Sequence, residues 1–410
     1  MKIHLKSIFT LGIFLFTSFL FSQKIKHYTG TIEISIEKHL LNAEFIISFE
    51  HLSKSDELKL FFPKSATISE ISSNAKSLTY TITEESFVGE DKAILIKNKN
   101  ITDGKIHLKY LFDLKKIENK NFPFNKDWLE LNIYNAWFPF NLDYGLFTYD
   151  INFILENELQ LIGSGQVSNT TNSWKMSQNI PFLDIPFIIS SKFKSISAAK
   201  KKVNVYHLNL EKNTTKTLEK NIETHLKQLN KMFGKTAKGN LTLAVNQFKR
   251  VTSYARKGFI SLSIGKTYDL NDDKTLAHEI AHLWWNKAEV SSWEDWLNES
   301  FAEYTSIILQ RKQYGEENFS KNIKELEETI KNAPSLQELK EKNTKNQTTI
   351  TYKGAYLLYQ LEVKIGRKNF EKLLKKVHQK EIKKTSDFLK LIKQKFGKET
   401  ENFIINELTK

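Results

Sequence analysis

The amino-acid sequence predicts an α+β protein, with an N-terminal antiparallel β-rich domain followed by a mostly helical domain. Two observations support this prediction. Between about residues 26 and 194, short apolar or alternating runs are separated by turns rich in Asn, Ser, Lys and Gly, a pattern typical of many short strands. From residue 272 onward, apolar residues recur at the spacing of amphipathic helices. A chain of 410 residues is long enough for two domains with buried cores.

The N-terminal half contains the strand candidates. The clearest runs of strand character cover residues 30–36, 43–49, 58–62, 106–112 and 149–155. Strands this short and this regularly spaced indicate a sandwich or an open, saddle-like antiparallel sheet. We place this β-rich domain at residues 23–197.

The second domain is predicted at residues 198–410, because the composition changes at the run Ala-Ala-Lys-Lys-Lys that begins there. It opens with a strand, a helix and two further strands, which we expect at 203–208, 215–233, 241–245 and 258–263. Helix stops are expected at Gly315, Pro334, Gly366 and Gly397. Residues 337–349 are polar and rich in Lys and Asn, and we expect them to form a solvated loop.

Composition excludes several classes of function. The chain has no cysteine, so it has no disulfide, no thiolate nucleophile and no cysteine metal site. Its net charge is +14 with 61 basic residues, but only Arg250, Arg256, Arg311 and Arg367 are arginine. Sequence-specific nucleic-acid binding relies heavily on arginine, so we interpret the charge as a lysine-rich solvated surface and predict no nucleic-acid partner. A basic surface-binding protein remains the alternative.

Residues 1–22 have the composition of an export signal. Lys2 and Lys6 precede an apolar stretch from residue 8 to residue 21, with a candidate cleavage point after Ser22. The stretch is shorter than the roughly 20 apolar residues of a membrane span. We therefore predict a protein exported to the periplasm or the cell exterior, without stable membrane insertion after cleavage. An uncleaved anchor is the alternative.

The segment His278-Glu279-Ile280-Ala281-His282 contains the strongest chemical signal. In a helix, two histidines four residues apart project from one face, where both can bind one zinc ion. Glu279 then lies beside the metal as a candidate general base. The alternative is a surface helix with two incidental histidines, but no other pair among the ten histidines has this spacing.

A catalytic zinc site needs a third protein ligand, and Glu299 is the candidate. It lies in Asp-Trp-Leu-Asn-Glu-Ser-Phe-Ala-Glu-Tyr, whose aromatic residues have helical spacing. Together the two segments resemble the zinc-binding core of the gluzincins related to membrane alanyl aminopeptidase. The resemblance implies a thermolysin-like catalytic domain, one zinc per chain, and Glu299 as the third ligand. Sixteen residues separate His282 from Glu299, two fewer than is usual in that family.

The resemblance extends to both sides of this core. The segment Trp-Phe-Pro-Phe at residues 137–140 is similar to the end of that family's β-rich domain. Thr-Tyr-Lys-Gly-Ala at 351–355 resembles the family segment whose tyrosine stabilises the oxyanion, so Tyr352 is the candidate donor. It is displaced by one residue, and an ordinary helix-start aromatic is the alternative. Glu303 and Asn298 are expected to support the ligands, although Glu303 could also be a solvated helix residue.

Two departures from the family concern substrate specificity. The family's acidic motif that binds a substrate's α-amino group is missing from residues 253–262, where Arg256 and Lys257 lie instead. Only residues 300–410 follow Glu299, so we do not expect the family's large C-terminal helical domain, and we expect an open cleft. Longer or internal peptide segments would suit such a cleft.

The predicted function is therefore zinc-dependent hydrolysis of peptide bonds in a peptide or protein substrate, by a metal-activated water with Glu279 as general base. The alternative is a secreted zinc-binding pseudo-peptidase that acts as a binding module. The missing acidic motif and the displaced Tyr352 favour this alternative. Glu279 argues against it, because a binding module does not need a general base.

Overall fold

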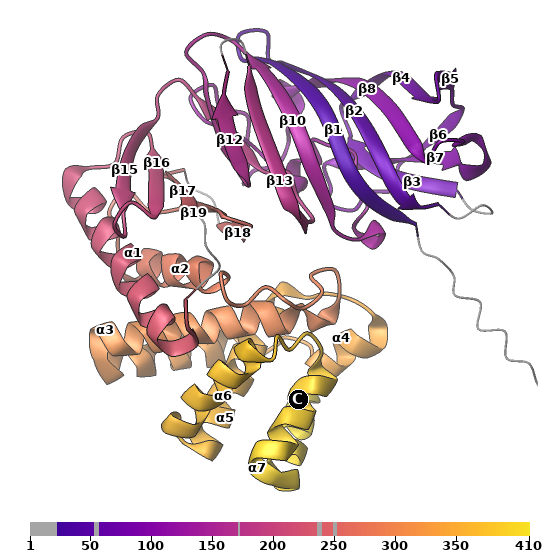
Figure 1. The fold of residues 1–410 in the computed structure, drawn as a ribbon. Coiled ribbons are helices and arrows are strands. Elements are labelled where there is room, and N and C mark those ends of the chain that lie inside the picture. The colour runs from indigo at the N-terminus through magenta and orange to yellow at the C-terminus, as the bar shows by residue number, and fades with distance from the viewer. Residues whose placement is uncertain (1–22, 53–56, 171–172, 236–239, 249–251) are drawn as a thin grey trace, which may run out of the picture.

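The computed structural model describes residues 23–52, 57–170, 173–235, 240–248 and 252–410. A large β region lies above a group of helices, and a smaller sheet lies to one side of it (Figure 1). The main sheet has the strand order β12-β13-β10-β1-β2-β8-β4-β5. Its strands are β1 (Lys24–Ser35), β2 (Leu40–His51), β4 (Thr67–Ser73), β5 (Lys76–Ser77), β8 (Lys105–Asp113), β10 (Phe147–Leu155), β12 (Gln166–Asn169) and β13 (Trp174–Phe182).

Alternation of buried and exposed residues explains the main sheet. Along β1, buried residues such as Tyr28, Ile32 and Ile34 face one side while their neighbours face solvent, the two-residue period of a strand. The buried face packs on Trp137 and Phe138 from the aromatic segment predicted at the end of this region. One detail departs from the antiparallel prediction: β1 pairs with β10 in parallel. The two strands are separated by 111 residues of chain, so no hairpin fixes their relative direction.

Two small sheets complete the N-terminal half. One contains β3 (Glu57–Pro63), β6 (Tyr80–Thr83) and β7 (Asp91–Lys97), and the other contains β9 (Leu129–Leu131), β11 (Gln160–Gly163) and β14 (Phe187–Ser190). The second small sheet reaches the helical half. Trp128 and Ile188 on its side form one apolar cluster with Tyr254 and Phe259.

A mixed five-stranded sheet begins the second half, in the order β15-β16-β17-β19-β18. Its strands are β15 (Lys194–Ala198), β16 (Val203–His207), β17 (Leu241–Asn246), β18 (Tyr254–Arg256) and β19 (Phe259–Ser263). The short strand β18 pairs only with β19 and forms one edge. Helix α1 (Lys212–Phe233) connects β16 to β17 and ends before Gly234, as predicted. The domain boundary at residue 198 stays a prediction.

The remaining helices are α2 (Leu270–Ala281), α3 (Trp296–Ile330), α4 (Leu336–Lys342), α5 (Gly354–Ile365), α6 (Arg367–Gln379) and α7 (Thr385–Leu408). The expected stops lie at a kink within α3 at Gly315, at the end of α5 at Gly366 and at a kink within α7 at Gly397. The loop prediction for residues 337–349 is wrong in part. Ser335 caps α4, and Leu336 and Leu339 bury its apolar side, which the polar composition concealed.

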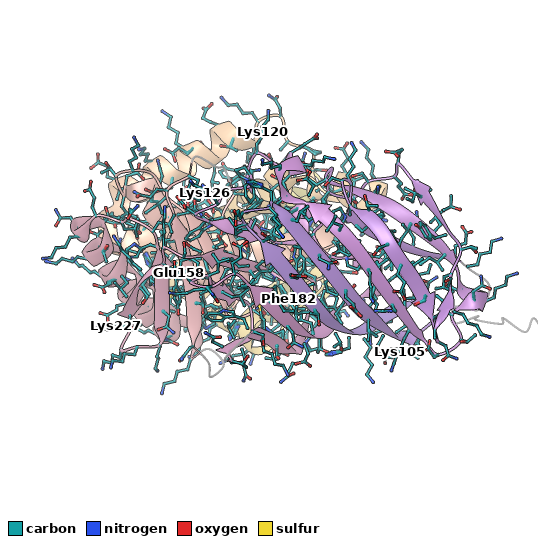
Figure 2. All side chains as sticks on the ribbon, turned by 90° about the horizontal axis from the view of Figure 1, so that it is seen from above. Lys105, Lys120, Lys126, Glu158, Phe182 and Lys227 are labelled. Carbon is teal, nitrogen blue, oxygen red and sulfur yellow. The ribbon has the colours of Figure 1, made fainter. Side chains whose placement is uncertain are left out.

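The architecture, β-rich first and mostly helical afterwards, confirms the predicted fold class. The predicted export signal at residues 1–22 lies outside the described residues, and export stays a prediction. Across the described part of the chain, no helix is both long enough and apolar enough to cross a membrane. Lysines such as Lys105, Lys120 and Lys227 project at well-separated places (Figure 2), as expected for a solvated lysine-rich surface.

Candidate active site

Helix α2 positions the two histidines. Asp269 caps it by accepting hydrogen bonds from the backbone N–H groups of Asn271 and Asp272. Leu276 and Ile280 are fully buried and fix which face of the helix meets the cleft. His278 and His282 lie one turn apart on that face, and their Nε2 atoms are 3.1 Å apart.

Glu299 reaches the histidines from α3. Its Oε2 atom lies 3.7 Å from His278 Nε2, and its Oε1 atom lies 3.5 Å from His282 Nε2. A tetrahedral zinc ion with bonds of 2.0–2.1 Å holds its ligand atoms roughly 3.3 Å apart. The three donors, which all lie within 4.8 Å of one another, therefore fit one such ion.

The outer nitrogens show how the two imidazoles are oriented. His282 Nδ1 lies 3.1 Å from the backbone oxygen of Trp285. Because a carbonyl oxygen can only accept, Nδ1 carries the hydrogen and Nε2 presents its lone pair to the donor cluster. His278 Nδ1 lies 2.9 Å from Glu303 Oε2, which orients the second ring in the same way. Two lone pairs directed at one point suit a cation between them.

Charges around the cluster shift the pKa values of its acids. Burial opposes ionisation of Glu299, but its electrostatic interaction with His282 and its hydrogen bond with His278 outweigh this effect and lower the Glu299 pKa to about 2. Burial likewise opposes ionisation of Glu303, and Lys274 and His278 lower its pKa to about 2. Both carboxylates are therefore ionised at neutral pH and available to a cation or its ligands.

Two residues that were not predicted as site residues, Gln347 and Thr351, contact the carboxylate of Glu299. The Nε2 group of Gln347 lies 3.3 Å from Glu299 Oε2, and the hydroxyl of Thr351 lies 3.4 Å from the same oxygen. Gln347 also donates to the Thr351 hydroxyl at 2.8 Å. Gln347 lies in the segment that we expected to be a solvated loop, so no sequence signal marked it.

Asn298 stabilises a loop, and its side-chain hydrogen bonds go to Ala288 and Asp295 instead of the candidate metal ligands. Its Oδ1 accepts from the backbone N–H of Ala288 and its Nδ2 donates to the backbone oxygen of Ala288, both at 3.0 Å. Nδ2 also donates to Asp295. Asn298 therefore stabilises the shortened connection between α2 and α3. It affects Glu299 only as the preceding residue of the same backbone.

Glu279 is 5% exposed and lies beside the donor cluster. Burial raises the pKa of its carboxyl, and electrostatic interactions with His278 and His282 partly offset this rise. It lines a cleft of about 2050 Å³ that runs between the two halves of the chain and also contains His278, His282 and Glu299. A buried carboxylate with a raised pKa beside an open cleft has the properties of a general base.

Tyr352 also lines this cleft. It belongs to a π-helical turn at Thr349–Lys353, a local widening of a helix that is frequent at functional sites. The hydroxyl of Ser300 donates to the backbone oxygen of Ile350 in this turn. A side chain at Gly354 would collide with Ser300, so the pair lets the turn lie close against α3. Burial and the charge of Glu303 raise the pKa of Tyr352, which keeps its hydroxyl protonated.

The edge strand β18 contributes Arg256 to the cleft. Its Nε donates to Asp184 Oδ2 at 2.7 Å, and its guanidinium stacks over Tyr254 with 4.6 Å to the ring centroid. Asp184 is fully buried and comes from the N-terminal half. Asp184 therefore compensates the charge of Arg256, one of the two basic residues that lie where the family's acidic motif is missing. Lys257, next to it, has no ion pair among the described residues.

The part of the chain that contains this site matches a known protein family. Residues 264–407 match the Peptidase family M1 domain, and this segment includes all of the donor residues and Glu279. The chain carries a peptidase family M1 domain. The predicted resemblance to the gluzincins is thereby confirmed, and the chain is a zinc metallopeptidase with a single catalytic zinc.

Solved structures share the whole architecture. A two-domain M1 zinc metallopeptidase variant bound to L-tryptophan has a TM-score of 0.71 at 16% identity, over 95% of both chains. The M1 zinc metallopeptidase from Deinococcus radiodurans has a TM-score of 0.70 at 15% identity, over 95% of this chain and 94% of the other. Leukotriene A4 hydrolase from Saccharomyces cerevisiae has a TM-score of 0.70 at 18% identity, over 95% and 68%. A search of curated protein sequences found no match.

Proposed function

We propose that this M1 peptidase holds its zinc ion with His278, His282 and Glu299 and uses Glu279 as the general base of peptide hydrolysis. One observation carries the proposal: the Nε2 atoms of His278 and His282 and the two carboxylate oxygens of Glu299 converge, with separations of 3.1–3.7 Å. Zinc at this position would act as a Lewis acid and lower the pKa of water.

The side chains around the metal site have separate roles in the hydrolysis of the peptide bond. The Glu279 carboxylate accepts a proton from the attacking water and later returns it to the nitrogen of the leaving amine. The Tyr352 hydroxyl donates a hydrogen bond to the developing oxyanion of the substrate. Glu303 orients the ring of His278, while Gln347 and Thr351 orient the carboxylate of Glu299. A peptide substrate is supported by a D. radiodurans M1 relative that was solved with a Tyr-Ser-Ala substrate, with a TM-score of 0.68.

We further propose that the enzyme does not depend on a free substrate α-amino group. Two acidic residues that line the cleft are already engaged: Asp295 with Lys345 at 2.8 Å and Glu303 with Lys274 at 2.7 Å. Glu289 also lines the cleft and has no ion pair among the described residues. The buried Asp184 is paired with Arg256. An ammonium group near β18 would instead meet Lys257, whose charge has no ion-pair partner in the part of the chain that the structure describes. These contacts support cleavage within longer peptides.

The first prediction tests metal and specificity together. We expect one zinc per purified chain by inductively coupled plasma mass spectrometry. We also expect peptides with blocked ends to be hydrolysed at least about tenfold faster, by kcat/KM, than fluorogenic amino-acid amides. A tenfold difference corresponds to about 1.4 kcal/mol, the size of one uncompensated charge contact in a partly hydrated site.

Three other outcomes would each contradict one of these proposals. Faster hydrolysis of the amino-acid amides would reject the internal-cleavage proposal and return the enzyme to aminopeptidase specificity. Zinc binding without hydrolysis of any peptide in a mixed library would favour the pseudo-peptidase. A chain that binds no zinc would contradict the ligand assignment itself.

The second prediction concerns Tyr352. If its hydroxyl stabilises the oxyanion, Tyr352→Phe lowers kcat by about 10²–10³-fold and changes KM little, because the contact forms only in the transition state. The matched control is Tyr356→Phe, one turn further along, whose hydroxyl binds Glu327 at the surface. Equal kcat values for the two variants and the wild type would remove Tyr352 from the mechanism.

A further inference from the structure

One buried cation in the cleft wall has no role in the mechanism described above. Lys274 lies on α2, four residues before His278, and therefore on the same face of the helix. Its ammonium group lies 2.7 Å from Glu303 Oε1, while Glu303 Oε2 lies 2.9 Å from His278 Nδ1. The three side chains form a continuous series from Lys274 through Glu303 to His278.

This ion pair differs from the surface pairs of the same domain. The side chains of Lys274 and Glu303 are 19% and 6% exposed. The pair of Lys312 and Glu371 on neighbouring helices is 35% and 38% exposed. Exposed pairs contribute little because water screens them, whereas a buried carboxylate that loses its cation is left uncompensated. Glu303 therefore depends on Lys274.

We propose that Lys274 is a positioning residue for the metal centre: it holds Glu303 in the orientation that fixes the imidazole of His278. The inference rests on the proposed ligand set. By engaging one carboxylate oxygen, the ammonium group leaves the other directed at His278 Nδ1. The ring is then held with Nε2 toward the donor cluster. Outer partners of this kind tune metal affinity even though they do not touch the ion.

Zinc affinity provides the test, measured by competition with a chromophoric chelator on the full chain. Lys274→Met keeps the length of the side chain and removes its charge, and we expect it to weaken zinc binding by about tenfold. Lys274→Arg should restore most of the loss. Lys227→Met is the matched control, because Lys227 is exposed on α1 (Figure 2), and it should bind zinc as the wild type does.

A double-mutant cycle separates positioning from general loss of stability. In the Glu303→Gln background no carboxylate remains for Lys274 to hold, so adding Lys274→Met should weaken zinc binding no further. This double variant also buries no unpaired carboxylate at position 303, so it remains testable if Lys274→Met folds poorly. In Co²⁺-loaded protein, Lys274→Met should shift the visible absorption bands, which report ligand geometry.

Two results would overturn the inference: unchanged zinc affinity and Co²⁺ spectrum in Lys274→Met, or equal losses from Lys274→Met in the wild-type and Glu303→Gln backgrounds. Either result would leave the ligand assignment intact, provided that the wild-type chain binds zinc. Failure of the wild type to bind zinc would instead reject the proposed site.

Discussion

Glu279→Gln is expected to lower kcat for peptide hydrolysis by about 10²–10⁴-fold, the usual contribution of a general acid–base group. The amide cannot accept the proton of the attacking water, and so cannot return it to the leaving amine. Zinc content should stay at one per chain, because Glu279 is not among the three converging donors. The measurement is kcat on a blocked peptide together with zinc analysis of the same sample.

The control for this prediction is Glu317→Gln, which makes the same chemical change at an exposed position of α3 and should leave kcat unchanged. Retained activity in Glu279→Gln would show that another group moves the proton. Loss of zinc in the same variant would mean that Glu279 acts as a ligand or supports one, contrary to its proposed role.

Arg256→Met is expected to lower the free energy of unfolding by about 3–5 kcal/mol, the cost of breaking a buried ion pair from one side. The substitution leaves Asp184, which is fully buried, without its cation. Asp184 also accepts hydrogen bonds from the backbone N–H groups of Ile133 and Ile185, and these neutral donors do not compensate a buried charge. Urea unfolding followed by tryptophan fluorescence measures the change.

Two companion variants test the reason for this loss. Replacing both partners, Asp184→Leu with Arg256→Met, should recover much of the stability because no unpaired charge remains. Lys321→Met breaks an exposed pair with Glu325 on α3 and should cost less than about 1 kcal/mol. If Arg256→Met is no more destabilising than Lys321→Met, the ion pair of Arg256 with Asp184 does not stabilise the contact between β18 and the N-terminal half.

The sequence by itself determined the features that are local along the chain. The helical spacing of His278 and His282 places them on one face whatever surrounds the helix, because a helix repeats about every 3.6 residues. Strand alternation likewise predicted the β-rich half, since successive side chains of a strand point to opposite faces. Glu299 was found through a motif resemblance and not through local geometry.

Only the tertiary structure decided how distant residues meet. Asp184 and Arg256 are 72 residues apart, and Gln347 and Glu299 are 48 apart, so no periodicity links them. The parallel pairing of β1 with β10 was missed for the same reason, whereas α4 was missed because its polar composition concealed its buried side. Burial and pairing of charges depend on which elements pack together, and the packing of the whole chain fixes that choice.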